Sequence, residues 1–389
     1  MYRIGKEEIE AVARVIESKD FFKINSSYRE CEKAENKMCA IWDVKNAILM
    51  TSGHAALVSA LVGMGVGPGD EVIVPAYTYM ATALAVVAAG AIPVIAEVDE
   101  TLTLDVADTE KKISPRTKAI LPVHIQGFPC NMDGIMALAE KYKLQVLEDA
   151  CQADGGTYKG KRLGSIGNAG ALSFNYFKVI TCGEGGALLT SDKKILERAM
   201  IYHDSNAIAF FGDQLSGNET DVFCGHEFRS NDINAAIIGV QLDRMDGILT
   251  DLRKNKKMMM EALSDCLTFA PTYDAEGDCG TTLAVRFETE EAARSFAKAE
   301  GVYGVLPIDT GKHVYTNWTP IMEKRGAFHP AMDPYKMAEN RECNMDYSLD
   351  MCPNTLDLLA RTVYISVNPD ATEEAMEQKI ACLRKAVQA

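Results

Sequence analysis

Short apolar runs alternate with amphipathic helical patterns between residues 47 and 191. Four of these runs predict buried strands, because they are short and rich in β-forming residues, and several end at Pro or Asp. They are residues 71–75, 91–98, 118–124 and 144–150. The stretch 132–143 has the apolar spacing of an amphipathic helix. Repeated strand–helix units of this kind predict an α/β fold, with a mainly parallel sheet covered by helices on both faces.

Helical spacing returns over residues 231–263 and predicts a long connecting helix. Beyond it the pattern predicts a smaller α+β region. Its expected elements are strands at 281–289 and 362–369 and helices at 290–301 and 372–388. We therefore expect an N-terminal segment that packs on the small domain, then a large domain and a small domain. The expected boundaries are 1–25, 26–245 and 246–389.

Composition narrows the class of protein. The 389 residues carry 40 Lys and Arg against 55 Asp and Glu, a net charge of −15, which argues against general binding to nucleic acid or an anionic membrane. The eleven cysteines include no CxxC pair, so we expect neither disulfides nor a metal site, and a reducing cytoplasm is the simplest location. The charged start lacks the apolar core of a signal peptide. The run 81–94 is short for a membrane span and contains Gly90 and Pro93.

Lys178 stands in an unusual setting. It follows two aromatic residues and precedes the turn Gly183-Glu184-Gly185-Gly186. Earlier in the chain, Asp149 ends a predicted strand, at the edge of a parallel sheet where ligands bind. Taken singly, the two residues read as a solvated lysine and a helix N-cap. Together they predict pyridoxal phosphate, because a lysine amine forms a Schiff base with its aldehyde and a carboxylate keeps its pyridinium nitrogen protonated.

Three stretches, residues 69–86, 148–156 and 173–192, resemble the DegT–StrS aminotransferases. Three motifs together carry the resemblance: EDACQA, a Ser-Phe pair with a lysine four residues after the phenylalanine, and GEGG. It implies a fold-type I pyridoxal-phosphate enzyme with a large domain on a seven-stranded-type, mainly parallel sheet and a smaller α+β C-terminal domain. It also implies pyridoxal 5′-phosphate as cofactor, pyridoxamine 5′-phosphate as an intermediate, and a homodimer with shared active sites.

The resemblance assigns roles at the matching positions. Lys178 is the Schiff-base lysine and proton shuttle, and Asp149 pairs with the ring nitrogen. The remaining positions bind the cofactor. They are Gln152 near the phenolic oxygen, Tyr79 on the ring face, and Ser173, Gly53 and the backbone of His54 and Ala55 around the phosphate. The alternative for Tyr79 is an ordinary core aromatic. The glycine loop opens a helix, where amide donors and the helix dipole favour a phosphate.

Two positions depart from the family pattern. His54 stands where the family has threonine, and Glu227 stands where the family places an asparagine that reaches the partner chain's phosphate. A carboxylate there is repulsive unless it is protonated or turned away. We expect His54 and Glu227 to meet across the subunit interface, with the pKa of His54 raised between two anions; otherwise both point to solvent. Arg229 matches a family arginine, with a structural ion pair as the alternative.

Candidate substrate residues come from a polar-aromatic stretch, 312–321, and from Phe22. Aromatic rings stack on sugar faces and amides bond hydroxyl groups, so this stretch could line a polyol site. Its candidates are His313, Tyr315, Asn317 and Trp318. The alternatives are a surface loop with a packing tryptophan and, for Phe22, the core. The layout resembles the family branch that aminates an eight-carbon 3-deoxy keto-sugar acid more than the nucleotide-sugar branches.

The function implied is transamination by a ping-pong mechanism, from glutamate or glutamine to a keto or aldehyde sugar. Two alternatives stay open. A cofactor-dependent sugar dehydratase of the same family would carry histidine in place of Lys178. A regulatory or sensory protein that keeps the fold without activity would suit the changes at residues 54 and 227.

Overall fold

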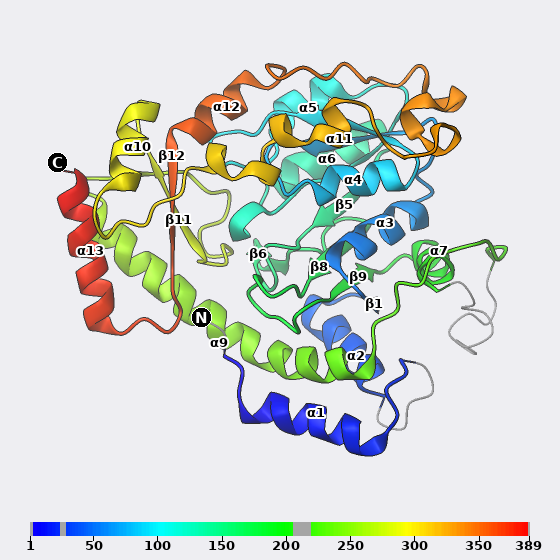
Figure 1. The fold of residues 1–389 in the computed structure, drawn as a ribbon, viewed down its shortest axis with the longest axis horizontal. Coiled ribbons are helices and arrows are strands. Elements are labelled where there is room, and N and C mark those ends of the chain that lie inside the picture. The colour runs from blue at the N-terminus through cyan, green and yellow to red at the C-terminus, as the bar shows by residue number, and fades with distance from the viewer. Residues whose placement is uncertain (1–2, 24–28, 205–218, 388–389) are drawn as a thin grey trace.

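The computed structural model describes residues 3–23, 29–204 and 219–387. Two units are joined by one long helix (Figure 1). The larger contains a seven-stranded sheet between helices, and the smaller contains a three-stranded sheet. The expected boundary at 245–246 falls inside the connecting helix α9 (Asp232–Leu263), which continues without a break. The boundary at 25–26 lies outside the described residues.

The strands of the large sheet lie in the order β1-β9-β8-β5-β4-β2-β3. They are β1 (Asn46–Met50), β2 (Glu71–Pro75), β3 (Ile92–Ala96), β4 (Thr117–Ile120), β5 (Gln145–Asp149), β8 (Ala169–Ser173) and β9 (Gly186–Thr190). The pairs from β8 to β3 are parallel, and β9 runs antiparallel to β1 and β8. The predicted α/β fold is confirmed, and the four predicted strands are β2, β3, β4 and β5. Because the parallel strands end at the same edge, the residues that follow them meet there.

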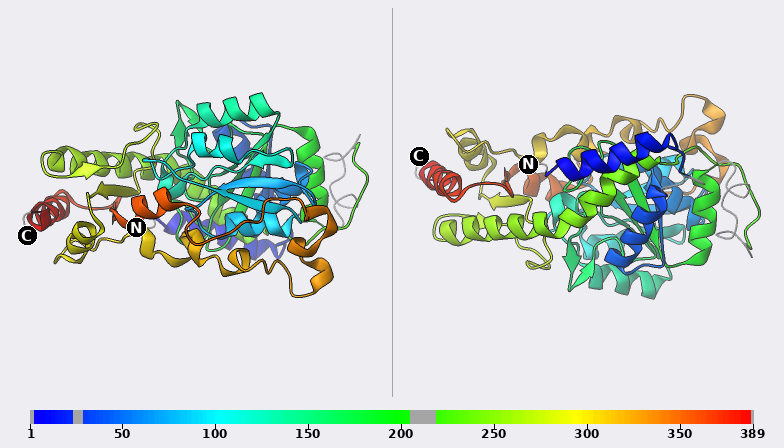
Figure 2. Two further views of the ribbon diagram at one scale, coloured as in Figure 1. Left: turned by 90° about the horizontal axis from the view of Figure 1, so that it is seen from above. Right: turned by 90° about the horizontal axis from the view of Figure 1, so that it is seen from below.

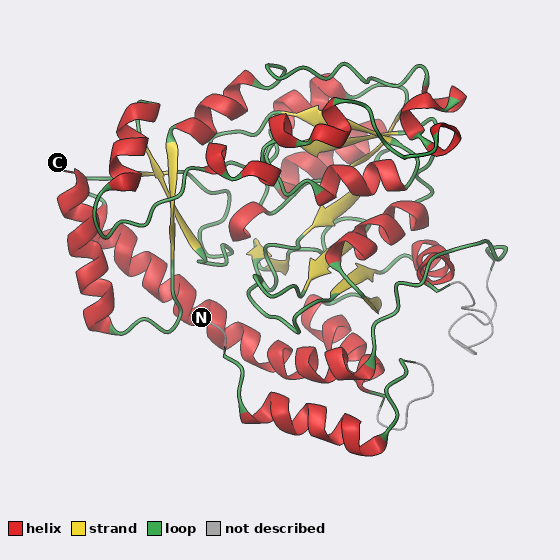
Figure 3. Ribbon diagram, viewed as in Figure 1, coloured by secondary structure: helices red, strands yellow, loops and turns green. Residues whose placement is uncertain are grey.

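Helices cover both faces of this sheet (Figure 3). Along β2, Val72 and Val74 lie in one apolar core and Ile73 in the other, because successive side chains of a strand point to opposite faces. The core of Val72 includes residues of α3 (Gly53–Gly63), α4 (Ala81–Ala88) and α7 (Lys193–His203). The core of Ile73 includes residues of α2 (Glu30–Trp42), α6 (Met132–Tyr142) and α9, with α5 (Val106–Lys112) beside α6.

The N-terminal helix α1 (Lys6–Ser18) lies along α9 (Figure 2). An apolar face of α1 packs on Ala236, and Arg244 forms an ion pair with Glu8. Both contacts fall on the first half of α9. Arg3, before the helix, forms an ion pair with Asp370 near the C-terminal helix. The N-terminal segment therefore packs mainly on the first half of the connecting helix and reaches the small unit through Arg3.

The small unit has an antiparallel sheet in the order β10-β11-β12. Its elements are β10 (Thr268–Phe269), β11 (Thr282–Arg286), β12 (Thr362–Ser366), α10 (Glu290–Lys298), α12 (Pro353–Ala360) and α13 (Glu373–Val387). The two strands and two helices predicted for this region are confirmed as β11, β12, α10 and α13. A hairpin of β6 (Thr157–Tyr158) and β7 (Lys161–Arg162) stands apart from both sheets.

Between α10 and α12 the chain returns over the large unit as a series of short helical turns (Figure 1). They are η3 (Pro307–Asp309), η4 (Gly311–His313), η5 (Tyr315–Asn317), α11 (Thr319–Met322), η6 (Pro330–Met332), η7 (Pro334–Lys336) and η8 (Ala338–Asn340). The amide of Asn344 donates to Glu71 Oε1 at 2.7 Å, and the hydroxyl of Tyr347 donates to Pro93 O at 2.7 Å. We call residues 307–352 the crossing segment; it is anchored on β2 and β3.

Glu148 holds a loop against the sheet. It is fully buried in β5, and its carboxylate accepts the amides of Gly164, Ile166 and Gly167 at 2.9, 2.6 and 2.7 Å. His124, which follows β4, lies 3.1 Å from the carboxylate through Nε2. That nitrogen is the donor, because Nδ1 of the same ring accepts a backbone amide.

We expect Glu148→Gln to lower the free energy of unfolding by about 3 kcal/mol. The amide nitrogen cannot accept, so buried N–H groups lose their partner at roughly 1–3 kcal/mol each. Urea unfolding measures the change, with Glu140→Gln, an exposed acid on α6, as the matched control. An unchanged unfolding midpoint in Glu148→Gln would contradict this role.

Candidate active site

Asp149 ends β5 and is 5% exposed. The hydroxyl of Thr82 donates to Oδ2 at 2.8 Å, and the amide of Cys151 donates to Oδ1 at 3.1 Å. The two donors together fix the orientation of the carboxylate. Thr82 lies in the first turn of α4, which follows β2, so the ends of two parallel strands meet here. A carboxylate oriented in this way at the sheet edge can pair with a protonated ring nitrogen.

The first turn of α3 lies directly against this strand end. A Cβ atom on Gly53 would lie 2.6 Å from Cys151 Sγ and 2.9 Å from Ser173 Cβ, closer than side chains approach. A Cβ atom on Gly186 would lie 2.3 Å from the carbonyl carbon of Ser52. Glycine is therefore needed at both positions, and the residues predicted to surround a phosphate are brought together.

Ser52 caps α3, since its hydroxyl accepts the amide of Ala55 at 3.1 Å. The amide of Ala55, one of the predicted phosphate donors, is therefore already engaged. The first N–H groups of a helix have no acceptor within it. The amides of Gly53 and His54 are thus the backbone donors that this helix end offers to an anion.

Lys178 lies half-buried on the loop between β8 and β9. Its amide donates to Asn175 O at 3.0 Å, and the amide of Tyr176 donates to Gly183 O at 2.9 Å. Gly183 has φ 92°, a conformation that residues with a side chain rarely adopt. The glycines after Lys178 therefore allow the loop to close. Gly183 adopts the positive φ that the turn requires, and Gly186 allows the backbone to approach α3 closely.

The charge of Lys178 acts on Cys151 and Asp154, which follow β5, and on His313 in η4. Burial raises the pKa of Cys151 and of Asp154 and lowers the pKa of His313. The positive charge of Lys178 lowers the pKa of all three, and so opposes the effect of burial at the thiol and the acid. Lys178 lies on the loop that follows β8, and β8 pairs with β5, the strand that Asp149 ends.

His54 and Glu227 make separate contacts within one chain. His54 Nδ1 lies 3.2 Å from Ala81 O, and burial lowers the pKa of His54, where we expected a rise. The side chain of Glu227 is 54% exposed and forms an ion pair with Arg229 at 2.9 Å. Arg229 also pairs with Asp204 at 2.8 Å, so it makes the ion pairs considered as its alternative role. A meeting of His54 and Glu227 across two chains stays a prediction.

Gln152, Tyr79 and His313 lie around the same edge. The side-chain oxygen of Gln152 accepts the amide of Gln126 at 3.2 Å. The rings of Tyr79 and His313 have centroids 5.4 Å apart, with their planes at 55°. The ring of Tyr79 is 42% exposed, so it is not a core aromatic and has a face open for stacking.

The other substrate candidates fall into two groups, buried and exposed. Tyr315 and Trp318 are fully buried, and each donates its polar hydrogen to a backbone carbonyl. The prediction that these two rings line a polyol site finds no support in their burial. Asn317 is exposed. Phe22 is exposed, and its ring centroid lies 5.1 Å from the guanidinium carbon of Arg229.

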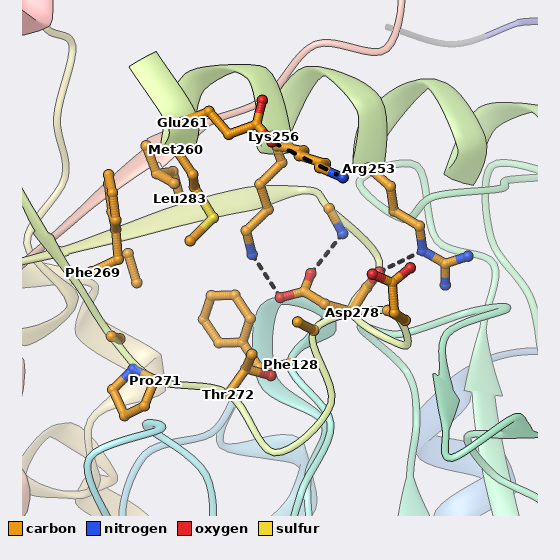
Figure 4. A pocket seen from close by; sticks show the side chains of 16 residues that line it. Phe128, Arg253, Lys256, Met260, Glu261, Phe269, Pro271, Thr272, Asp278 and Leu283 are labelled. Carbon is orange, nitrogen blue, oxygen red and sulfur yellow. Dashed lines mark hydrogen bonds and ion pairs between the residues drawn. The ribbon is translucent and has the colours of Figure 1, made fainter. Parts of the chain in front are cut away.

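A cavity of about 290 Å³ lies on the small-unit side, between α9 and the strands β10 and β11 (Figure 4). Phe128, Phe269 and Leu283 form part of its apolar lining, and Lys256 on α9 pairs there with Asp278 at 2.6 Å. None of the sequence-predicted site residues is among the residues that line it. This cavity is therefore separate from the site around Asp149.

The described residues contain no group of three or more His, Cys, Asp or Glu side chains that could hold a metal ion. No helix within them combines the length and the apolar character needed to cross a bilayer.

Sequence reasoning missed Thr82 and Asp154. Thr82 lies in an apolar helical run, and nothing local signals that its hydroxyl meets an acid. Asp154 is fully buried, and neither of its carboxylate oxygens has a hydrogen-bond partner among the described residues. The sequence did contain a signal for Asp154, because it is a further acid within the motif of residues 148–156.

Comparisons with known proteins identify the family of this chain. The model of the DegT/DnrJ/EryC1/StrS aminotransferase family matches residues 2–301. GDP-perosamine synthase of Caulobacter vibrioides is 43% identical over 56% of this chain and 56% of its own length. The dTDP-3-amino-3,4,6-trideoxy-alpha-D-glucose transaminase of Streptomyces venezuelae is 38% identical over 61% of this chain and 60% of its own length. The chain thus matches less than two thirds of either relative.

Both curated names carry a nucleotide-linked sugar and give no support to the 3-deoxy sugar-acid branch. Among solved structures, S. venezuelae DesV in complex with a ketimine intermediate matches 98% of this chain and 95% of its own chain. The TM-score is 0.79 at 29% identity. The chain belongs to the DegT/DnrJ/EryC1/StrS aminotransferase family.

Proposed function

We propose that the protein is a pyridoxal-phosphate-dependent aminotransferase. It moves an amino group from glutamate or glutamine to a keto or aldehyde sugar in two half-reactions. The observation that carries the proposal is the meeting of three features at the ends of β5 and β8: the oriented carboxylate of Asp149, the N-terminus of α3, and the Lys178 loop. Pyridoxal phosphate supplies an electron sink when its ring nitrogen stays protonated.

Each residue then has a defined task. Asp149, oriented by Thr82 and the Cys151 amide, would hold the proton on the ring nitrogen. The amides of Gly53 and His54 and the positive end of the helix dipole suit the phosphate. Lys178 would hold and move a proton at its Nζ atom during transamination. Tyr79, whose ring is 42% exposed, has a face that would be available to stack on the ring of the cofactor.

The half-reactions test this function. The purified protein is mixed with a panel of amino acids without acceptor, and cofactor absorbance is followed. We expect glutamate or glutamine to convert the cofactor once, and a keto sugar to reverse the conversion. The sugar panel contains nucleotide-linked and free forms, because the curated relatives are named for nucleotide-linked sugars. If no amino acid in the panel converts the cofactor, the proposal fails.

The proposal includes a homodimer with shared sites, located in the cytoplasm. Beside Lys178, the side chain of Phe177 is 82% exposed and that of Tyr176 is also exposed. Phe21 and Phe22 are exposed as well. Apolar rings around a polar site favour a second copy of the chain as their cover. A reducing compartment suits eleven cysteines that are all free thiols.

We expect sedimentation to show a dimer. The variant Phe177→Glu should raise the Kd of the dimer by about tenfold or more, because an unpaired carboxylate buried in the interface costs well over 1.4 kcal/mol. Activity should fall with the dimer fraction. Phe328→Glu, at a fully exposed phenylalanine in the crossing segment, is the matched control and should leave the dimer intact. A fully active wild-type monomer would contradict the proposal.

A further inference from the structure

Glu184 lies in the glycine turn after Lys178 and has no task in the proposed function. The residue is exposed, yet its side chain has a partner, because Asn175 Nδ2 donates to Glu184 Oε1 at 2.9 Å. The backbones of the same two branches of the loop also meet, through a bridge between Asn175 and Gly183. The side-chain bond therefore joins the residue that precedes Lys178 in the loop to the turn that follows it.

Asn175 opens the turn that contains Lys178. Its carbonyl oxygen accepts the Lys178 amide at 3.0 Å, and its side-chain Oδ1 accepts the Phe177 amide at 3.2 Å. The second bond closes an Asx turn, for which asparagine and aspartate are well suited. Because Oδ1 is used in this way, the amide nitrogen of the same side chain faces away from the turn, where it meets Glu184. One side chain thus ties the backbone around Lys178 to the glycine turn.

The glycine turn is in addition fixed to α9. Asn234 Nδ2 donates to Glu184 O at 2.9 Å. Asn234 lies in the first turn of α9, and its own amide donates at 3.1 Å to the side chain of Asn231, which caps the helix. A continuous path of hydrogen bonds therefore runs from the start of α9 through Glu184 and Asn175 to the backbone of Lys178.

We propose that Glu184 and Asn175 are positioning residues for Lys178, and that Asn234 links them to α9. The inference rests on the proposed function, in which the amine of Lys178 forms the Schiff base and moves the proton. A catalytic group gains rate when it is held in the reactive geometry, and a small displacement costs a large factor. A lysine has a flexible four-carbon stem, so the direction of its backbone decides where its amine can reach.

The donor and acceptor of this bond can be exchanged, which gives the test its design. Asn175→Asp keeps an oxygen for the Phe177 amide but sets a carboxylate against that of Glu184, and like charges at this distance repel. Glu184→Ala removes the acceptor, whereas Glu184→Gln keeps an acceptor oxygen. In the double variant Asn175→Asp, Glu184→Gln the introduced amide donates to the introduced carboxylate, so the hydrogen bond returns with its direction reversed.

The first measurement compares two forms of the cofactor on the apoenzyme, without turnover. Pyridoxal 5′-phosphate can link to Lys178, whereas pyridoxamine 5′-phosphate has no aldehyde and cannot. A displaced lysine should therefore weaken binding of the first form alone. We expect Glu184→Ala and Asn175→Asp to raise the Kd of pyridoxal phosphate by about fivefold or more, with the Kd of pyridoxamine phosphate within about twofold of wild type. Glu184→Gln and the double variant should bind both forms as wild type does.

The second measurement is the half-reaction with an amino donor. The maximal rate of cofactor conversion should fall by about fivefold or more in Glu184→Ala and Asn175→Asp, while the donor concentration at half-maximal rate stays within about twofold. The double variant should recover the rate. Asn234→Ala should show a smaller loss, because the bond between Asn175 and Glu184 remains, and alanine suits a helix. Glu140→Ala, at an exposed acid on α6, is the matched control and should behave as wild type.

Three results would overturn the proposal. The first is wild-type binding and rate in folded Glu184→Ala and Asn175→Asp. The second is equal weakening of both cofactor forms, which would assign the pair a structural role alone. The third is a loss in the single variants without recovery in the double variant, which would place the effect outside their hydrogen bond.

Thermal unfolding identifies a variant that does not fold. Glu184→Ala, which truncates an exposed side chain, carries the test if Asn175→Asp does not fold. Failure of the proposed function is seen separately, in the wild type alone. It would appear as a protein that takes up no pyridoxal phosphate or is converted by no amino donor.

Discussion

Lys178→Ala loses covalent attachment of the cofactor and slows turnover by about 10⁴-fold or more, because the group that forms the Schiff base and the group that moves the proton are the same amine. The loop survives the change, since the amide of Lys178, not its side chain, bonds Asn175. Borohydride reduction followed by peptide mass spectrometry measures the attachment. Wild type should gain the cofactor mass on the Lys178 peptide and the variant should not.

Lys161→Ala, which removes an exposed lysine from β7, is the matched control and should behave as wild type. Covalent cofactor and normal turnover in Lys178→Ala would reject the assignment of this lysine.

Asp149→Asn should keep the fold and lower the rate by about 10²- to 10³-fold. A neutral amide cannot hold the proton on the ring nitrogen by charge, and each unit lost from the pKa of that nitrogen costs about 1.4 kcal/mol, or tenfold in rate. The amide oxygen can still accept one of the two hydrogen bonds that Asp149 receives. Steady-state kinetics and thermal unfolding, measured together, separate the loss of rate from any loss of stability.

Thr82→Val provides the graded comparison, because it removes one donor and leaves the carboxylate in place. It should cost less than Asp149→Asn. A wild-type rate in Asp149→Asn would show that no charge is needed at this strand end.

The elements predicted from sequence are those whose signals are local. Strands buried on both faces appear as short apolar runs, so β2 to β5 and the helices α6, α9, α10 and α13 could be predicted. Lys178 and Asp149 could be singled out because motif and strand end coincide. In both cases a few neighbouring residues carry the information.

What could not be predicted depends on contacts between distant segments. The crossing segment returns over β2 and β3 through hydrogen bonds such as that from the Asn344 amide to the Glu71 carboxylate, and nothing local signals where it will lie. Its return buries Tyr315 and Trp318, which locally resemble a sugar-binding stretch. The pKa of His54 is governed by its burial against α4, which the family comparison at that single position does not reveal.

The unbroken helix α9 has a consequence for how the chain can change length. It spans 32 residues from the large unit into the small one. Each residue of an α-helix advances it by about 1.5 Å and turns it by about 100°. One residue inserted near Asp251 would therefore swing the whole small unit around the helix axis and away from the large unit. Only insertions of about a whole number of helical turns would keep the orientation of the small unit relative to the large unit. Insertions and deletions should therefore accumulate in the crossing segment, where loops tolerate them.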